Sequence, residues 1–149
     1  MEWIERLSGH TVAIDTAPII YFIEGRPEFL ETLRVFFAAL HVGKFLAVTS
    51  TVTLTEVLVH PIRAGQQRLC DRYRKILLNE EHLHLIPVTH RIAEKAAEIR
   101  AKYNLRTPDS IQIAVAHTTH ADFLLTNDMQ LSRLSSPKVL VLNALVGQV

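Results

Sequence analysis

The sequence predicts an α/β protein of three layers, α/β/α, in which a central parallel sheet of four to five strands carries helices on both faces. Short apolar or β-branched runs alternate along the chain with segments of helical periodicity. Strands that alternate with helices favour a doubly wound parallel sheet. The 149 residues contain no internal repeat, and this length is typical of one domain. We therefore expect a single domain spanning residues 1–149.

Each expected element in the first half of the chain depends on a local signal. The apolar and β-branched run at residues 11–14 predicts a strand. Pro18 suits the first turn of the helix that follows. Ser50 or Thr51 is placed to cap a helix that stops near Pro61. In order, the expected elements are a strand at 11–14, helices at 18–24 and 28–41, a strand at 45–49 and a helix at 51–61.

The second half has its clearest helix start at Thr107, Pro108 and Asp109. They supply a capping hydroxyl, a proline for the first helical position and an acid in the first turn. Residues 111–116 are apolar on almost every side, so we expect that helix to be buried. In order, the expected elements are helices at 66–79 and 90–103 with a strand at 83–88 between them, the helix from 107, a strand at 123–125, a short helix at 129–134 and a strand at 139–142.

Four carboxylates stand where an apolar run ends or a helix begins: Asp15, Glu56, Asp109 and Asp128. Asp15 and Asp128 follow expected strands, whereas Glu56 and Asp109 are expected in the first turns of helices. Sites in doubly wound sheets form outside the carboxyl ends of the strands. All four acids are therefore expected at one edge of the domain. Taken singly, each acid is equally compatible with a helix cap or an ordinary helix residue.

The cost of gathering these acids indicates what else the site must contain. Two carboxylates about 4.5 Å apart repel by roughly 4 kcal/mol at an effective dielectric constant of 20. Folded domains have only about 5–15 kcal/mol of net stability. A cation, protons or a basic side chain must therefore offset the repulsion. Oxygen ligands without a set of Cys or His favour Mg²⁺ or Mn²⁺ over zinc, and such ions support reactions at phosphates.

The net charge of +1 hides an uneven distribution. Residues 57–106 carry 10 basic and 5 acidic side chains, while both flanking segments are net acidic. A basic surface beside an acidic site suits a polyanionic substrate, although a solvated helix face explains the same segment. Arg106 is placed to contact substrate or to offset the acids. One cysteine and no long apolar run favour a cytoplasmic protein without a membrane span or secretory signal.

Four segments, in their order and spacing, resemble a PIN domain: IDTAPIIYFIEG, TLTEVLV, RTPDSIQIAVA and DFLLTND. The resemblance runs from about Val12 to Val141. Within that family the chain is similar to the VapC-type toxins of bacterial and archaeal toxin–antitoxin pairs. The resemblance implies a PIN-like fold and a Mg²⁺- or Mn²⁺-dependent endoribonuclease that leaves a 3′-hydroxyl and a 5′-phosphate.

The resemblance also implies roles for individual residues. Asp15, Glu56, Asp109 and Asp128 match the family's acidic quartet, which implies that they are catalytic and hold the metal. Thr126 matches a hydroxyl residue often found beside that site, and Arg106 is an auxiliary candidate for substrate. The implied partners are an RNA substrate, a cognate antitoxin protein and often a second copy of the chain, docked around the early helices and the helix beyond Glu56.

Two other functions stay open at this point. One is a PIN-like module that binds RNA or protein without nuclease activity, although an intact quartet argues against it. The other is a metal-dependent phosphatase on a similar α/β fold. Against that alternative, the DTA that follows the first expected strand lacks the second Asp such phosphatases use, and no suitably placed Lys follows a late strand.

Overall fold

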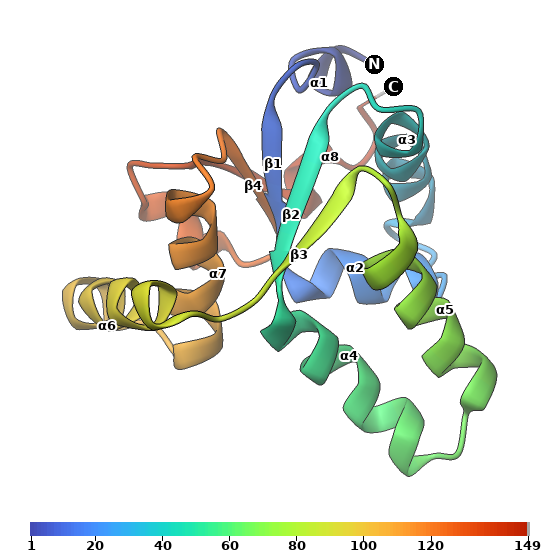
Figure 1. Ribbon diagram of the computed structural model, residues 1–149. Helices are drawn as coiled ribbons and strands as arrows, with labels where there is room; N and C mark the ends of the chain where they lie inside the picture. Colours follow the sequence, from blue (N-terminus) through green and yellow to red (C-terminus); the bar gives the residue numbers. More distant parts are fainter. Residues whose placement is uncertain (149) are drawn as a thin grey trace.

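A computed structural model describes residues 1–148 and shows five parallel strands in one sheet (Figure 1). The strands lie side by side in the order β3-β2-β1-β4-β5. Helices cover both faces, so the predicted α/β/α architecture with four to five strands is confirmed. In chain order the strands are β1 (Thr11–Ile14), β2 (Leu46–Ser50), β3 (Leu83–Ile86), β4 (Phe123–Thr126) and β5 (Lys138–Val141).

The helices divide between the two faces because successive side chains of a strand point to opposite sides. Val12 and Ile14 of β1 pack into a cluster with α1 to α5 and α8, whereas Ala13 packs into a second cluster with α6 and α7. In chain order the helices are α1 (Glu2–Glu5), α2 (Thr16–Ile23), α3 (Leu30–His41), α4 (Thr51–Arg63), α5 (Gln67–Asn79), α6 (His90–Tyr103), α7 (Thr107–Thr118), the 3₁₀ helix η1 (Met129–Arg133) and α8 (Leu142–Leu145).

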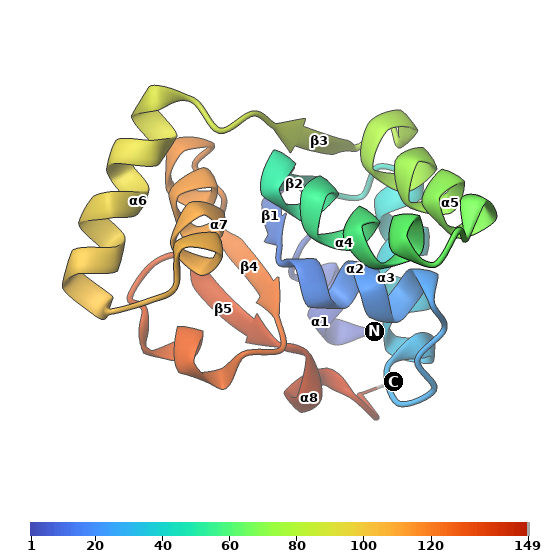
Figure 2. The ribbon, with the colours of Figure 1, turned by 90° about the horizontal axis from the view of Figure 1, so that it is seen from below.

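The direction of the strand order reverses between β1 and β4. From β1 the chain moves outward through β2 to β3, then crosses to the other side of β1 to form β4 and β5. Crevices outside the carboxyl ends of strands form at such a reversal. Figure 2 looks onto this end of the sheet and shows α2 and α4 on one side of it and α7 on the other.

Most element boundaries agree with the sequence predictions, with local differences at the end of α4 and at the start of α7. The Ser50 side chain caps α4 by accepting from the Val52 amide, as expected. However, α4 continues to Arg63 with Pro61 inside it, two residues beyond the predicted end. Thr107 does not cap α7, because its hydroxyl instead accepts a hydrogen bond from Arg100. Within the described residues, no helix has the length and apolar character that crossing a membrane requires.

Candidate active site

Asp15 lies at the strand reversal and is held by β4 and by the first residue of α2. Its amide donates to the carbonyl of Leu125 on β4, which extends the pairing of β1 and β4 by one residue. Its carboxylate accepts from the Thr126 hydroxyl at 2.8 Å and from the Thr16 amide at 2.8 Å. Asp15 therefore caps α2 while it is held by the end of β4, and its position follows directly from strand pairing.

Glu56 reaches the same region from α4. The sequence predicted Glu56 in the first turn of its helix. It lies in the second turn, because α4 begins at Thr51. One Glu56 carboxylate oxygen accepts from the Thr16 hydroxyl at 2.8 Å. Thr16 thus joins two members of the quartet, since its amide binds Asp15 and its hydroxyl binds Glu56.

Asp109 occupies the first turn of α7, as predicted, and is paired with Arg106. The Arg106 Nε lies 3.3 Å from the Asp109 Oδ2, and this hydrogen bond raises the pKa of the Arg106 guanidinium. The Arg106 side chain is 80% exposed and that of Asp109 only 14%. An exposed arginine on a partly buried acid is free to exchange this partner for another anion, because surface ion pairs are weak.

All four predicted acids line one cavity of about 420 Å³, which we call the acid cavity. Asp128 contributes from the loop after β4, where its side chain also caps η1. Among the described lining residues, Arg106 is the one basic side chain. Thr126 lies beneath the cavity and reaches it through Asp15. The lining consists of Asp15, Thr16, Ala17, Ile20, Tyr21, Glu56, Arg106, Asp109, Asn127 and Asp128.

A buried hydroxyl and amide network supports Glu56 and was not foreseen from the sequence. The Thr16 hydroxyl is 2.9 Å from that of Thr53, which is 3.0 Å from that of Thr49. The Gln112 amide donates to Thr53 and, at 3.4 Å, to Thr16. Gln112 is only 3% exposed. A glutamine inside the apolar run of α7 was the available signal, because a buried amide needs hydrogen-bond partners.

The pKa of Asp15 reflects its burial first and the neighbouring acids second. Burial raises the pKa of the Asp15 carboxyl above its usual range. Hydrogen bonds from Thr126 and Thr16 act in the opposite direction, while the charges of Asp109 and Glu56 raise the pKa further. The site therefore disfavours the full set of negative charges in the absence of a compensating cation.

The donor set of the acid cavity fits a hard divalent cation. Carboxylate oxygens from four separate segments meet there, and Mg²⁺ and Mn²⁺ prefer such oxygen ligands. Within residues 1–148, however, no three His, Cys, Asp or Glu side chains are already close enough together to hold a metal ion. The acids are instead occupied by Thr16, Thr126 and Arg106. An ion bound to these carboxylates would therefore compete with the hydrogen bonds that they accept.

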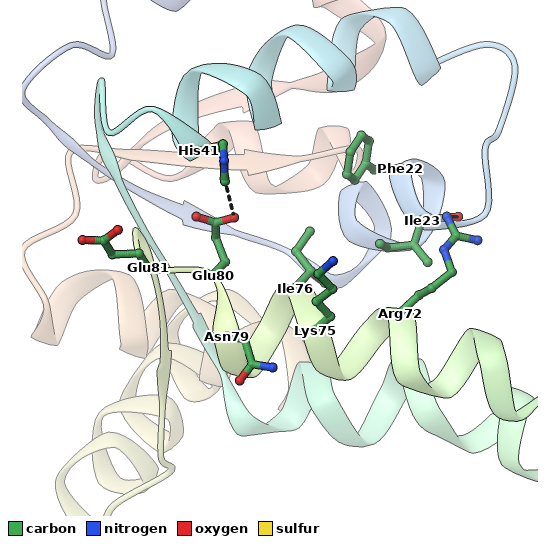
Figure 3. A pocket seen from close by; sticks show the side chains of 9 residues that line it. All are labelled: Phe22, Ile23, His41, Arg72, Lys75, Ile76, Asn79, Glu80 and Glu81. Carbon is green, nitrogen blue, oxygen red and sulfur yellow. Dashed lines mark hydrogen bonds and ion pairs between the residues drawn. The ribbon is translucent and has the colours of Figure 1, made fainter.

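A second cavity, of about 550 Å³, lies beside α5 and holds none of the quartet (Figure 3). We call it the α5 cavity. His41 Nδ1 lies 3.2 Å from Glu80 Oε2, and the Arg72 guanidinium donates to the carbonyl of Ile23. Arg72 and Lys75 come from the basic segment noted in the sequence, and neither lines the acid cavity. The lining consists of Phe22, Ile23, His41, Arg72, Lys75, Ile76, Asn79, Glu80 and Glu81.

Comparison with known proteins agrees with the predicted resemblance. The family model described as PIN domain matches residues 12–136. VapBC2 from Rickettsia felis, bound to promoter DNA, has a TM-score of 0.70 at 15% identity, covering 88% of this chain and 98% of that chain. A toxin–antitoxin complex from Klebsiella pneumoniae has a TM-score of 0.65 at 24% identity, covering 88% and 97% respectively.

A third solved structure is VapC20 from Mycobacterium tuberculosis, described as a toxin that cleaves the sarcin-ricin loop. Its TM-score is 0.63 at 18% identity, and the match covers 76% of this chain and 86% of that chain. No curated protein matches the chain significantly. The prediction of a PIN-like fold is therefore confirmed by the family match and by the shared architecture.

Proposed function

Because this chain belongs to the PIN-domain family, we propose that it is a Mg²⁺- or Mn²⁺-dependent endoribonuclease, the toxin of a toxin–antitoxin pair. One observation carries the proposal. Asp15, Glu56, Asp109 and Asp128, which come from four separate segments, line one cavity at the strand reversal. A neutral or purely structural role would not explain why a fold gathers four acids against their mutual repulsion.

The cation would be held by Asp15, Glu56 and Asp109, directly or through water, and Asp128 would complete its surroundings or hold a second ion. When bound, it supplies a Lewis acid that neutralises charge on the phosphate and makes water a better nucleophile. Thr16 and Thr126 hold the Asp15 carboxylate in place by the hydrogen bonds described above. Thr16 does the same for Glu56.

The proposed reaction is hydrolysis of an RNA phosphodiester. Water attacks phosphorus in line with the P–O3′ bond, and the leaving O3′ takes a proton, giving a 3′-hydroxyl and a 5′-phosphate. Arg106 is 80% exposed at the rim of the cavity. Its guanidinium would be available there to bind a phosphate oxygen of the substrate. Phosphate binding would explain why a base, Arg106, is paired with Asp109 at the rim of the acid cavity.

The partners in the proposal are an RNA substrate, a cognate antitoxin and a second copy of the chain, with residues 1–149 acting as one nuclease domain in the cytoplasm. Val59 and Ile62 lie three residues apart on α4 and are 40% and 59% exposed. They supply apolar surface beyond Glu56 on which a partner helix or segment would pack. Co-purification from the native host tests this part, since a small bound protein supports the toxin role and its absence argues against it.

Cleavage of RNA by the purified chain tests the nuclease activity. With Mn²⁺ or Mg²⁺, wild type should cut single-stranded or structured RNA. Asp15→Asn and Asp109→Asn should lose roughly a hundredfold or more in rate, because loss of groups merely supporting a metal site already costs about 10–100-fold. Glu80→Gln in the α5 cavity is the matched control and should retain full activity. Intact RNA with wild type, or cleavage that persists in both Asn variants, would overturn the proposal.

A further inference from the structure

The acid cavity has a second wall that metal binding does not require. Ala17, Ile20 and Tyr21 line the cavity from α2. Their spacing of three and four residues places them on one face of this helix. A hydrated cation and a phosphate need polar surroundings, so an apolar wall beside the acids indicates a ligand that also has an apolar part.

Tyr21 is the residue on this wall that the structure holds most firmly. Its ring stacks on Phe29 with centroids 4.8 Å apart and an interplanar angle of 16°. Phe29 is only 2% exposed, so it forms a fixed support. The Arg26 guanidinium carbon lies 4.7 Å from the Tyr21 ring centroid, and the Arg26 amide donates to the Tyr21 carbonyl. Phe29 covers one ring face, the Arg26 guanidinium lies beside both rings, and the half-buried Tyr21 side chain lines the acid cavity.

We propose that Tyr21 is a stacking platform for an unpaired nucleobase next to the scissile phosphate, an inference that rests on the proposed nuclease function. A nucleotide combines an anionic phosphate with a flat apolar base, which matches the two walls of the cavity. Aromatic side chains bind single-stranded nucleic acid in this way, since every base has a π-face. The platform is built in advance by Phe29 and Arg26, so stacking does not require the ring to be ordered first.

This platform selects among RNA structures. A base inside a continuous duplex has both faces covered by its neighbours, so it meets Tyr21 only after it leaves the stack. We therefore expect the base that contacts Tyr21 to be unpaired, in a single strand or a loop. Continuous duplex of the same sequence is a poor substrate.

The test compares Tyr21→Leu with Tyr21→Phe, because stacking uses the ring and not the hydroxyl. With Mn²⁺ and a short single-stranded RNA, Tyr21→Leu should raise KM about tenfold while kcat changes little, and Tyr21→Phe should match wild type. A duplex of the same sequence should show no difference between the variants. Tyr21→Met provides a second non-aromatic variant, and melting curves establish that each variant is folded.

A binding measurement without divalent cation separates this inference from the nuclease proposal. A short RNA containing the fluorescent base aminopurine should be quenched by wild type and Tyr21→Phe, but not by Tyr21→Leu or Tyr21→Met. Quenching without any cleavage in Mn²⁺ would support the platform while the nuclease proposal fails. Equal KM values and equal quenching for all four proteins would contradict the proposed role of Tyr21. The apolar wall would then be a surface for a protein partner.

Discussion

The acid cavity and the α5 cavity have similar sizes, but the fold arranges charge in them differently. Two bases, Arg72 and Lys75, and two acids, Glu80 and Glu81, line the α5 cavity, and His41 bonds to Glu80 (Figure 3). Opposite charges there balance one another within the protein. The acid cavity instead holds four acids against the single guanidinium of Arg106. Cavity volume therefore does not distinguish the two sites, whereas uncompensated charge at a strand reversal does.

The two cavities also differ in what lies beneath them. Under the acid cavity, Thr16, Thr53, Thr49 and Gln112 form a buried chain of hydrogen bonds. The polar groups of the α5 cavity are nearer the surface, and Asn79 is exposed. Buried polar networks specify one arrangement because an unmade hydrogen bond is costly there. We infer that the network fixes Glu56 for function and that nothing equivalent is needed in the α5 cavity.

The largest difference between the two cavities is expected in stability and cleavage when a side-chain amide is removed from each. Gln112→Leu leaves the hydroxyls of Thr16 and Thr53 without their donor, which costs about 1–3 kcal/mol of unfolding free energy. Cleavage should fall roughly 10–100-fold, as for other groups that support metal ligands. Urea unfolding and RNA cleavage measure the two effects.

Asn79→Ala in the α5 cavity is the control for that experiment. Its side chain is exposed, so the unfolding free energy should change by less than about 0.5 kcal/mol and cleavage should not change. If Gln112→Leu behaves like Asn79→Ala in both measurements, the buried network does not position the acids.

A smaller difference is expected in the melting temperatures of variants of the two cavities, measured without divalent cation. Burial raises the pKa of Asp15 in the folded state, so its ionised form opposes folding above the unfolded pKa. Asp15→Asn should therefore melt at the same or a higher temperature than wild type at neutral pH. The advantage should shrink as pH falls through the folded pKa and vanish below the unfolded pKa, because wild-type Asp15 is then protonated in both states.

Glu80→Gln is again the comparison, since Glu80 pairs with His41 and lies outside the acid cavity. It should show no such gain at neutral pH in melting curves recorded with a chelator. A clear loss of melting temperature in Asp15→Asn at neutral pH would show that like charges do not strain the acid cavity.

The sequence predicted the position of the acids better than the groups that hold them. Asp15 and Asp128 follow strands, and the carboxyl ends of parallel strands share one edge, so their convergence was predictable from local patterns. The links from Gln112 to Thr53 and Thr16 join segments 59 and 96 residues apart. No local pattern encodes such pairings, because they depend on how α7 packs against the sheet.

The structure differs from the sequence predictions at two helix ends. Pro61 was expected to end α4, but it lies in the last turn, and the helix closes at Arg63. The Thr107 hydroxyl was expected to cap α7, but Arg100 of α6 offers it a competing partner at 2.7 Å. For Thr107, a contact from another helix decided the outcome. These errors did not displace Asp109, which still opens α7 as predicted.

Binding of Mn²⁺, followed by calorimetric titration, tests most directly whether the four acids form one cation site. Wild type and Glu80→Gln should bind with the same affinity, because Glu80 lies in the α5 cavity. Asp15→Asn and Asp109→Asn should each bind at least about tenfold more weakly, since each loses a charged oxygen ligand. Equal affinity in all four proteins, or no binding by wild type, would contradict a shared metal site in the acid cavity.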